Sequence, residues 1–231
     1  MYSGGRNTTL NTIYLIRHGE NKANLTKEFS YKKVDYPLTP KGVLQARQTA
    51  EYFKDKHIDE IYTSPLKRAR ETAEIIAEAL GLEVVVMEQF REVNVGELED
   101  RPPDAETWAM HNRILGGWLN GHREIPFPGG ENYFQLLARM REGMRQVVSG
   151  KSGKHILVVA HGGIISATLR DLCQNVNLEE LGRQENHNCS ITEIELAHAN
   201  GRLEGALKAW ATHSHLYGSA AELVSGSPDF K

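Results

Sequence analysis

Two histidines stand directly after apolar stretches of the sequence, and each is followed by glycine. In residues 13–20, four apolar or aromatic residues precede Arg17, His18 and Gly19. Such a stretch favours a strand buried on both faces, and the glycine lets the chain turn where the strand ends. That end of a strand is where open α/β sheets bind ligands. A nucleophilic imidazole beside a fixed guanidinium at this place predicts a site that handles phosphate.

The second histidine, His161, has the same setting. It follows an apolar strand predicted over residues 155–160 and precedes Gly162 and Gly163. If the two strands are neighbours, both imidazoles open into one crevice. Backbone N–H groups of the two glycines, at the start of a helix, would add hydrogen-bond donors for the same anion. For each motif alone, a structural histidine bonded to a loop carbonyl is the alternative, and the presence of both motifs weakens it.

A helix predicted over residues 64–80 begins with an unusual concentration of positive charge. Ser64 is expected to cap it. Its first turns hold Lys67, Arg68 and Arg70. Each cation near a helix N-terminus costs up to about 1 kcal/mol, and a local rule broken in this way tends to mark a functional site. We expect Lys67 and Arg70 to face solvent and Arg68 to reach the strand ends, where it can bind phosphate oxygens bidentately.

Cleavage of a phosphate monoester needs an acid for the leaving oxygen, in addition to a nucleophile and cations. Glu92 is the preferred candidate, because it lies just beyond an apolar strand predicted over residues 82–87. Other carboxylates lie nearby in the sequence and keep the assignment open: Glu97, Glu99 and Asp100.

Periodicity in the rest of the sequence predicts the elements that position these side chains. Apolar stretches indicate strands at residues 12–17, 58–63, 82–87 and 155–160. Amphipathic stretches indicate helices at residues 39–53, 64–80 and 162–173. A turn at Asn200 and Gly201 joins two further strands, at residues 190–196 and 203–211. The predicted fold is an α/β three-layer sandwich, a mostly parallel sheet with an antiparallel edge hairpin.

Other segments are expected to lie outside this sandwich, although the whole chain, residues 1–231, is predicted to be one domain. They are a loose leader (1–11), a long loop (21–39), a helical cap insertion (100–154, with helices at 104–119 and 131–148) and a flexible tail (218–231). Some polar and aromatic side chains of the loop and the cap are expected to be solvated or to serve packing: Lys27, Lys32, Lys33, Trp108, His111, Trp118 and His122.

The overall composition excludes several classes of protein. The 231 residues include 27 Lys and Arg against 30 Asp and Glu, so the net charge is −3, without the basic excess of nucleic-acid binders. No apolar run approaches the roughly 20 residues that span a bilayer, and residues 1–11 lack the apolar core of a signal peptide. Cys173 and Cys189 have no zinc-type spacing. We expect a cytoplasmic protein without a metal or other cofactor and without a nucleic-acid or membrane partner.

Taken together, the motifs resemble those of the histidine phosphatase superfamily, the phosphoglycerate-mutase-like group. The resemblance is carried, in the family's order, by residues 17–20 with Asn24, residues 64–73, 91–92, 129–131, 158–163 and 214–216. It implies a sandwich with a cap, with His18 as the phosphorylated nucleophile and Glu92 as the proton donor. The implied phosphate pocket consists of Arg17, Arg68 and His161, with Asn24 as a further contact, and the backbone N–H of Gly162 is expected to join it from the helix start. Asn24 could equally be a turn residue.

The sequence thus predicts a metal-independent phosphomonoester hydrolase of the histidine acid type, which acts on a small phosphorylated metabolite through a phosphohistidine. A phosphoglycerate mutase is the first alternative, but residues 21–31 lack the tryptophan-containing elements typical of mutases in this family. A non-catalytic phosphate-binding protein is the second, and the complete catalytic set argues against it. Departures from the family pattern at Asn21, residues 98–100 and Asn132 leave the substrate open. The oligomeric state is open as well, a dimer included.

Overall fold

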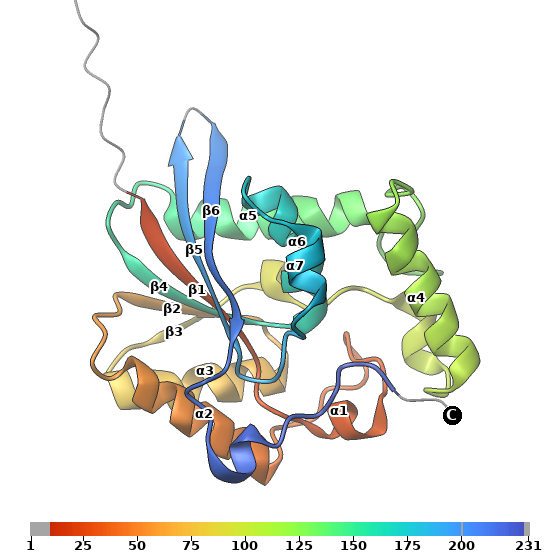
Figure 1. Ribbon diagram of the computed structural model, residues 1–231, viewed down its shortest axis with the longest axis horizontal. Helices are drawn as coiled ribbons and strands as arrows, with labels where there is room; N and C mark the ends of the chain where they lie inside the picture. The colour runs from red at the N-terminus through yellow and green to blue at the C-terminus, as the bar shows by residue number, and fades with distance from the viewer. Residues whose placement is uncertain (1–9, 200, 229–231) are drawn as a thin grey trace, which may run out of the picture.

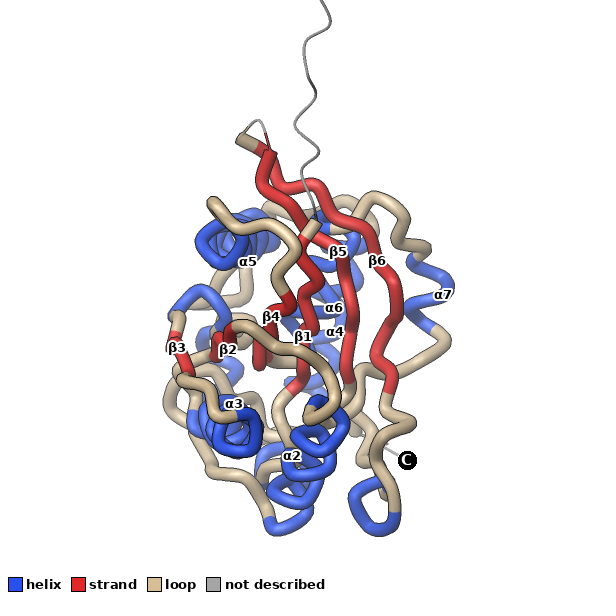
Figure 2. Tube along the Cα trace, turned by 90° about the vertical axis from the view of Figure 1, so that its left-hand side faces the viewer, coloured by secondary structure: helices blue, strands red, loops and turns tan. Residues whose placement is uncertain are grey.

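Six strands form one sheet in the computed structural model, which describes residues 10–199 and 201–228 (Figure 1). The strands are β1 (Asn11–Arg17), β2 (Glu60–Thr63), β3 (Val84–Val86), β4 (His155–Ala160), β5 (Ile191–Ala199) and β6 (Arg202–Thr212). Their order is β3-β2-β4-β1-β5-β6. Neighbours from β3 to β1 run parallel, whereas β5 is antiparallel to both β1 and β6. The predicted mostly parallel sheet with an antiparallel edge hairpin is confirmed, and Figure 2 shows the hairpin at one side.

The register of the central strands brings the two histidine motifs together. Arg17 at the end of β1 pairs with Ala160 at the end of β4. Both strands are buried almost throughout, which explains their continuous apolar sequences. Because parallel strands end at the same edge of the sheet, the next residues, His18 and His161, leave it together, and their ring centroids lie 5.1 Å apart. The two strands are therefore neighbours, as the shared crevice requires.

Helices α2 (Pro40–Phe53) and α3 (Lys67–Leu80) cover one face of the sheet (Figure 1). Tyr14 and Ile16 of β1 pack on this face with Ile76 of α3. Thr39 caps α2 as its sequence predicts, because its hydroxyl oxygen accepts the N–H of Gly42 at 3.0 Å. The two helices thereby bury every second residue of β1, because successive side chains of a strand point to opposite faces of the sheet.

Helices α5 (Tyr133–Val148) and α6 (Gly162–Leu172) cover the other face. Ile13 and Leu15 of β1 pack on this side. Their partners on α5 form an apolar stripe: Leu136, Met140, Met144 and Val147. We expected this helix within the cap, but it is a layer of the sandwich, because its stripe runs along the helix at a spacing of three or four residues and is buried against the sheet.

The part of the chain that stands away from the sheet is therefore smaller than the expected cap, residues 100–154. It is formed by α4 (Ala105–Leu119), which Figure 1 shows beside the sandwich. Trp118 of α4 is buried and packs edge-on against Phe127 and Tyr133. Trp118 thus fixes the projecting helix to the start of α5.

The segment predicted as a long loop, residues 21–39, contains a short helix, α1 (Lys22–Thr26). Asn21 and Asn24 form a reciprocal capping box at its start, because each side-chain oxygen accepts the other's backbone N–H. Two asparagines can therefore start a helix in a segment whose composition otherwise favours a loop. The remaining short elements are η1 (Glu88–Phe90), η2 (Gly96–Asp100), α7 (Leu178–Gly182) and η3 (Gly218–Ala221).

Part of the expected flexible tail follows the molecular surface. Ala220 in η3 is buried, and its carbonyl accepts a hydrogen bond from the side chain of Gln45 in α2 at 3.1 Å. Residues 229–231 of that tail, residues 1–9 of the expected leader, and Asn200 lie outside the described residues. Ala199 pairs with Arg202 at the end of the hairpin formed by β5 and β6. Within the described ranges, no helix is long and apolar enough to cross a membrane.

Candidate active site

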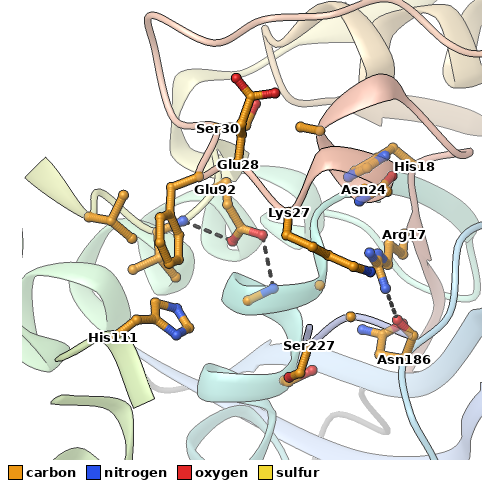
Figure 3. A pocket seen from close by; sticks show the side chains of 18 of the residues that line it. Arg17, His18, Asn24, Lys27, Glu28, Ser30, Glu92, His111, Asn186 and Ser227 are labelled. Carbon is orange, nitrogen blue, oxygen red and sulfur yellow. Dashed lines mark hydrogen bonds between the residues drawn. The ribbon is translucent and has the colours of Figure 1, made fainter. Parts of the chain in front are cut away.

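A cavity of about 330 Å³ lies at the carboxyl ends of β1 and β4. Figure 3 shows the side chains that line it. The lining includes most residues that the sequence singled out: Arg17, His18, Asn24, Arg68, Glu92, Gly162 and Gly163. These residues come from four separate parts of the chain, so the fold brings them to one place. His161 is fully buried beside this group, with its ring next to that of His18.

The ring of His18 has a hydrogen-bond partner on each nitrogen. Nδ1 lies 2.7 Å from the carbonyl oxygen of Gly19 and must donate to it, so Nδ1 carries the proton. Arg68 donates from Nε to Nε2 at 3.0 Å, which shows that Nε2 bears the lone pair. Burial, and next the charges of Arg68 and Arg17, hold the pKa of His18 well below 6.5. His18 is therefore a neutral imidazole at neutral pH, with Nε2 ready to attack.

Arg68 is buried at the start of α3, whereas Lys67 and Arg70 are exposed, as predicted. Its guanidinium also donates to the hydroxyl and the carbonyl oxygen of Ser30, both at 2.8 Å. Burial lowers the pKa of Arg68 to about 10, so the side chain stays cationic at neutral pH. The helix that carries it begins after Leu66.

Ser64, the expected helix cap, has another role in the structure. Its hydroxyl lies 2.7 Å from Nε2 of His161. Burial, and next the charges of Arg68 and neighbouring groups, lower the pKa of His161 well below 6.5. Within the described part of the chain, Nδ1 of His161 is buried without a hydrogen-bond partner. Buried polar atoms are normally paired, so the unpaired nitrogen indicates a place for a ligand atom.

Arg17 is buried at the end of β1 and donates from one terminal nitrogen to the carbonyl of Asn186 (Figure 3). Its Nε has no partner among the described residues. A Cβ on Gly162 would lie 3.3 Å from this Nε. Glycine therefore lets the guanidinium lie against the first turn of α6, where the N–H of Gly162 and the guanidinium can share one anion. The N–H of Gly163, predicted as a second donor to that anion, is instead bound to Glu92.

Glu92 lies at the same helix start. Its carboxylate accepts the backbone N–H of Val93 at 2.8 Å, of Gly163 at 3.0 Å and of Ile164 at 2.8 Å. A Cβ on Gly163 would lie only 2.6 Å from Oε1 of Glu92, so the carboxylate can hold this place only with glycine at position 163. The carboxylates that the sequence left as alternatives, Glu97, Glu99 and Asp100, do not line the cavity. Of these four carboxylates, Glu92 alone lines the cavity and stays the candidate for the acid.

Asn24 lines the cavity, but its side chain has partners within the protein. Its Oδ1 accepts the N–H of Asn21 at 3.0 Å and the side-chain amide of Asn188 at 3.1 Å. Asn188 in turn donates to the carbonyl of His18 at 2.9 Å. Asn24 therefore helps to cap α1 and supports the backbone that carries His18, and its contact with phosphate stays a prediction.

Lys27 was expected to be solvated, and the structure places it in the cavity lining. Figure 3 shows its side chain directed toward Arg17. Nζ donates to the carbonyl of Ser225 at 2.6 Å, and partial burial together with the charge of Arg17 lowers the pKa of Lys27. Trp108 and His111 of α4 also line the cavity.

Several residues that support the site carry no signal in the sequence. Ser30, Asn186 and Asn188 lie in irregular segments, where neither periodicity nor a motif marks them. Ser64 belongs to a motif that predicts a helix cap, whereas the structure pairs its hydroxyl with His161. Over residues 10–199 and 201–228, no group of three or more His, Cys, Asp or Glu side chains is placed to hold a metal ion.

Comparison with known proteins agrees with this arrangement. The profile of the histidine phosphatase superfamily (branch 1) matches residues 13–207. The chain is 35% identical over 209 residues to "Uncharacterized phosphatase PhoE" of Bacillus subtilis, covering 90% of this chain and 98% of the relative. It is 34% identical over 189 residues to "Probable phosphoglycerate mutase GpmB" of Erwinia tasmaniensis, covering 79% and 84%.

A solved structure is similar as well. The chain superposes on Bacillus stearothermophilus YhfR with a TM-score of 0.72 at 26% identity, covering 89% of this chain and 98% of YhfR. The match extends over the strands and helices that carry both histidine motifs, since the family profile runs from β1 into β6. The chain therefore belongs to the histidine phosphatase superfamily, branch 1.

Proposed function

We propose that this protein is a metal-independent phosphomonoester hydrolase that acts on small phosphorylated substrates through a phosphohistidine at His18. One observation carries the proposal: Nε2 of a neutral, buried His18 bears its lone pair within a cavity lined by Arg17 and Arg68. A neutral imidazole between two cations suits attack on a phosphate dianion, because the cations offset the charge that would otherwise repel a nucleophile.

In the first step, the phosphoryl oxygens bind Arg17, Arg68 and the backbone N–H of Gly162, because the N–H groups of Gly163 and Ile164 already hold Glu92. Nε2 attacks phosphorus in line, the bond from phosphorus to the ester oxygen breaks, and Glu92 gives its proton to the leaving alcohol. In the free protein, Nε of Arg68 donates a hydrogen bond to Nε2 of His18. When substrate binds, the same N–H donates to a phosphoryl oxygen instead. The bond from Nδ1 to the Gly19 carbonyl stabilises the positive ring that forms.

In the second step, the carboxylate of Glu92 takes a proton from a water molecule, whose oxygen attacks the phosphohistidine. The bond between phosphorus and Nε2 breaks, the electron pair returns to the imidazole, and inorganic phosphate leaves. Glu92 is then protonated again for the next turnover, so protons balance over the cycle.

Rapid quenching under alkaline conditions tests the nucleophile. We expect mass spectrometry to locate an acid-labile phosphate on His18 during turnover of p-nitrophenyl phosphate, and His18→Ala to lose nearly all activity. Phosphate on His161 instead, or on neither histidine, would overturn the assignment. His122 lies outside the cavity lining, so His122→Ala is the matched control and should retain wild-type turnover.

The relative named as a mutase favours phosphoglycerate mutase as a second candidate. A mutase must exclude water so that its phosphorylated enzyme survives until the intermediate has turned over. Incubation with 3-phosphoglycerate and a trace of 2,3-bisphosphoglycerate separates the two reactions. We expect free phosphate to appear faster than 2-phosphoglycerate, since residues 21–31 lack the tryptophan-containing elements of mutases. Faster formation of the isomer would replace the hydrolase proposal with the mutase.

A further inference from the structure

One side of the cavity is apolar and aromatic. We call it the aromatic wall, and it consists of Phe29, Val93, Val95, Trp108, His111 and Leu115. Figure 3 shows His111 on the opposite side of Glu92 from Arg17 and Lys27. When Glu92 protonates the ester oxygen, as proposed above, that oxygen lies beside Glu92. The rest of the leaving alcohol then extends toward the aromatic wall, away from the phosphate.

The rings of this wall hold one another in place. Phe29 and Trp108 have ring centroids 4.6 Å apart, and each lies about 5 Å from His111, at 4.9 Å and 5.1 Å. The indole N–H of Trp108 donates to the carbonyl of Lys27 at 3.0 Å, so α4 is joined to the segment that carries Phe29. A wall fixed in this way is preorganised for a flat group, and little side-chain freedom is lost on binding.

The positive charges of the cavity lie elsewhere. Arg17 and Arg68 belong to the phosphate site, and the side chain of Lys27 points toward Arg17 (Figure 3). Burial lowers the pKa of His111, so its imidazole is neutral at neutral pH. Among the described lining residues, the aromatic wall therefore offers no cation to a carboxylate on the leaving group. It offers apolar surface instead, which favours an uncharged group.

Resting on the proposed phosphatase function, we propose that the preferred substrates are monophosphates of alcohols that carry an aromatic ring or a similarly flat apolar group near the ester oxygen. The ring lies against the aromatic wall while the phosphate binds Arg17 and Arg68. Carboxylated alcohols, such as those of phosphoserine and 3-phosphoglycerate, lack this contact and would place a charge on an apolar surface.

A set of alkyl phosphates tests the proposal without differences in leaving-group reactivity. 2-Phenylethyl phosphate and ethyl phosphate release similarly basic alkoxides, so a difference in kcat/KM between them reports contact with the ring. We expect a ratio of about tenfold or more in favour of the phenyl compound. The kcat/KM values for phosphoserine and 3-phosphoglycerate should be no higher than the value for ethyl phosphate. Equal values for the two alkyl esters, or a preference for a carboxylated ester, would overturn the inference.

Substitutions in the wall assign the preference to its residues. Phe29→Leu keeps an apolar side chain and removes the ring, and it should reduce the phenylethyl-to-ethyl ratio by about threefold. Phe134, which is 54% exposed and does not line the cavity, provides the matched control. Phe134→Leu should leave the ratio unchanged. An unchanged ratio in Phe29→Leu would count against the wall.

Binding of phosphonates separates this inference from the proposed function. In 3-phenylpropylphosphonate and propylphosphonate, a methylene group replaces the ester oxygen, so neither can be hydrolysed. Calorimetry should give tighter binding of the phenyl compound by about the same tenfold factor, and Phe29→Leu should reduce it. If no ester is hydrolysed but this binding preference is present, the hydrolase proposal fails and the wall assignment stands. If esters are hydrolysed without any preference for the phenyl compounds, the hydrolase proposal stands and the wall assignment fails.

Discussion

The carboxylate of Glu92 is held by three backbone N–H groups, two at the start of α6 (Gly163 and Ile164) and one from its neighbour Val93. Gly163 makes this approach possible, because any Cβ there would collide with Oε1. The helix start thus has two uses: it binds the proposed acid, and its first residue, Gly162, lines the cavity together with Arg17. In the proposed reaction, protonation of the leaving oxygen depends on one side chain whose position the backbone determines.

The role of Glu92 can be read from the basicity of the leaving group. Glu92→Gln cannot donate a proton as an acid, and this matters more when the departing oxygen is a strong base. We expect single-turnover rates with ethyl phosphate to fall by roughly 10²-fold or more, and rates with p-nitrophenyl phosphate to fall much less. Glu97→Gln is the matched control, since Glu97 lies outside the cavity lining. Equal losses for both substrates would show that Glu92 is not the acid.

At the residue scale, the sequence predicts the functional groups that belong to a recognisable motif. His18, Arg68 and Glu92 could be named because each follows or begins a periodic element. Ser30 could not, since it touches Arg68 across 38 positions of the chain from a segment without periodicity. Lys27 was expected to be solvated, and the sequence could not show otherwise, because its partner Ser225 lies 198 positions further along the chain.

At the scale of elements, η2 supports the active site through a loop. One oxygen of Glu99 in η2 accepts the backbone N–H groups of four consecutive residues, 31–34, at 2.7 to 3.0 Å. Ser30, directly before them, holds the guanidinium of Arg68, which lies against His18. A carboxylate outside the cavity thus positions the guanidinium of Arg68 next to the proposed nucleophile, His18.

Loosening this loop should change the titration of the nucleophile. In Glu99→Gln, the amide binds the four N–H groups less strongly than a carboxylate does, so Arg68 is held less firmly. Because the charge of Arg68 lowers the pKa of His18, its withdrawal lets that pKa rise toward 6.5. We expect the acidic limb of kcat/KM to move to higher pH, along with about a tenfold loss at neutral pH. Glu97→Gln should show neither change. Lost activity with an unshifted acidic limb would indicate a structural role only.

The helices show where prediction from periodicity ends. The apolar stripe of α5 identified it as a helix with one buried face, but a stripe does not say which surface covers it. The prolines and tryptophans around it favoured a cap, and the sheet turned out to be its partner. α1 was missed because a helix of five residues is too short for a periodic signal, and its two capping asparagines are equally typical of turns.

At the scale of the whole molecule, a single sheet edge gathers the chemistry. Because β2, β4 and β1 are parallel and adjacent, their following segments contribute Ser64, His161 and His18 to one place. The antiparallel hairpin then closes the sheet at the opposite side from β3. A chain with a net charge of −3 can in this way concentrate cations in one cavity.

The proposed reaction draws its positive charge from Arg17 and Arg68, and this predicts the response to two reagents. Prolonged treatment with EDTA should leave kcat unchanged, because protein cations already bind the phosphoryl oxygens. Vanadate, which mimics five-coordinate phosphorus, should inhibit competitively. Both are measured with p-nitrophenyl phosphate, and dialysed enzyme without EDTA provides the reference. Activity that is lost in EDTA and regained with Zn²⁺ or Mg²⁺ would contradict the mechanism.

The path of the last described residues affects how the protein can be attached to a solid support. Gly226 and Ser227 line the cavity, whereas Leu10 precedes the amino end of β1, at the opposite edge of the sheet. Immobilisation through the N-terminal side would leave the cavity facing the solution. Attachment beyond Ser227 would place the support beside the cavity and restrict the passage of substrate. A biosensor built on this fold should therefore be anchored at its N-terminal side.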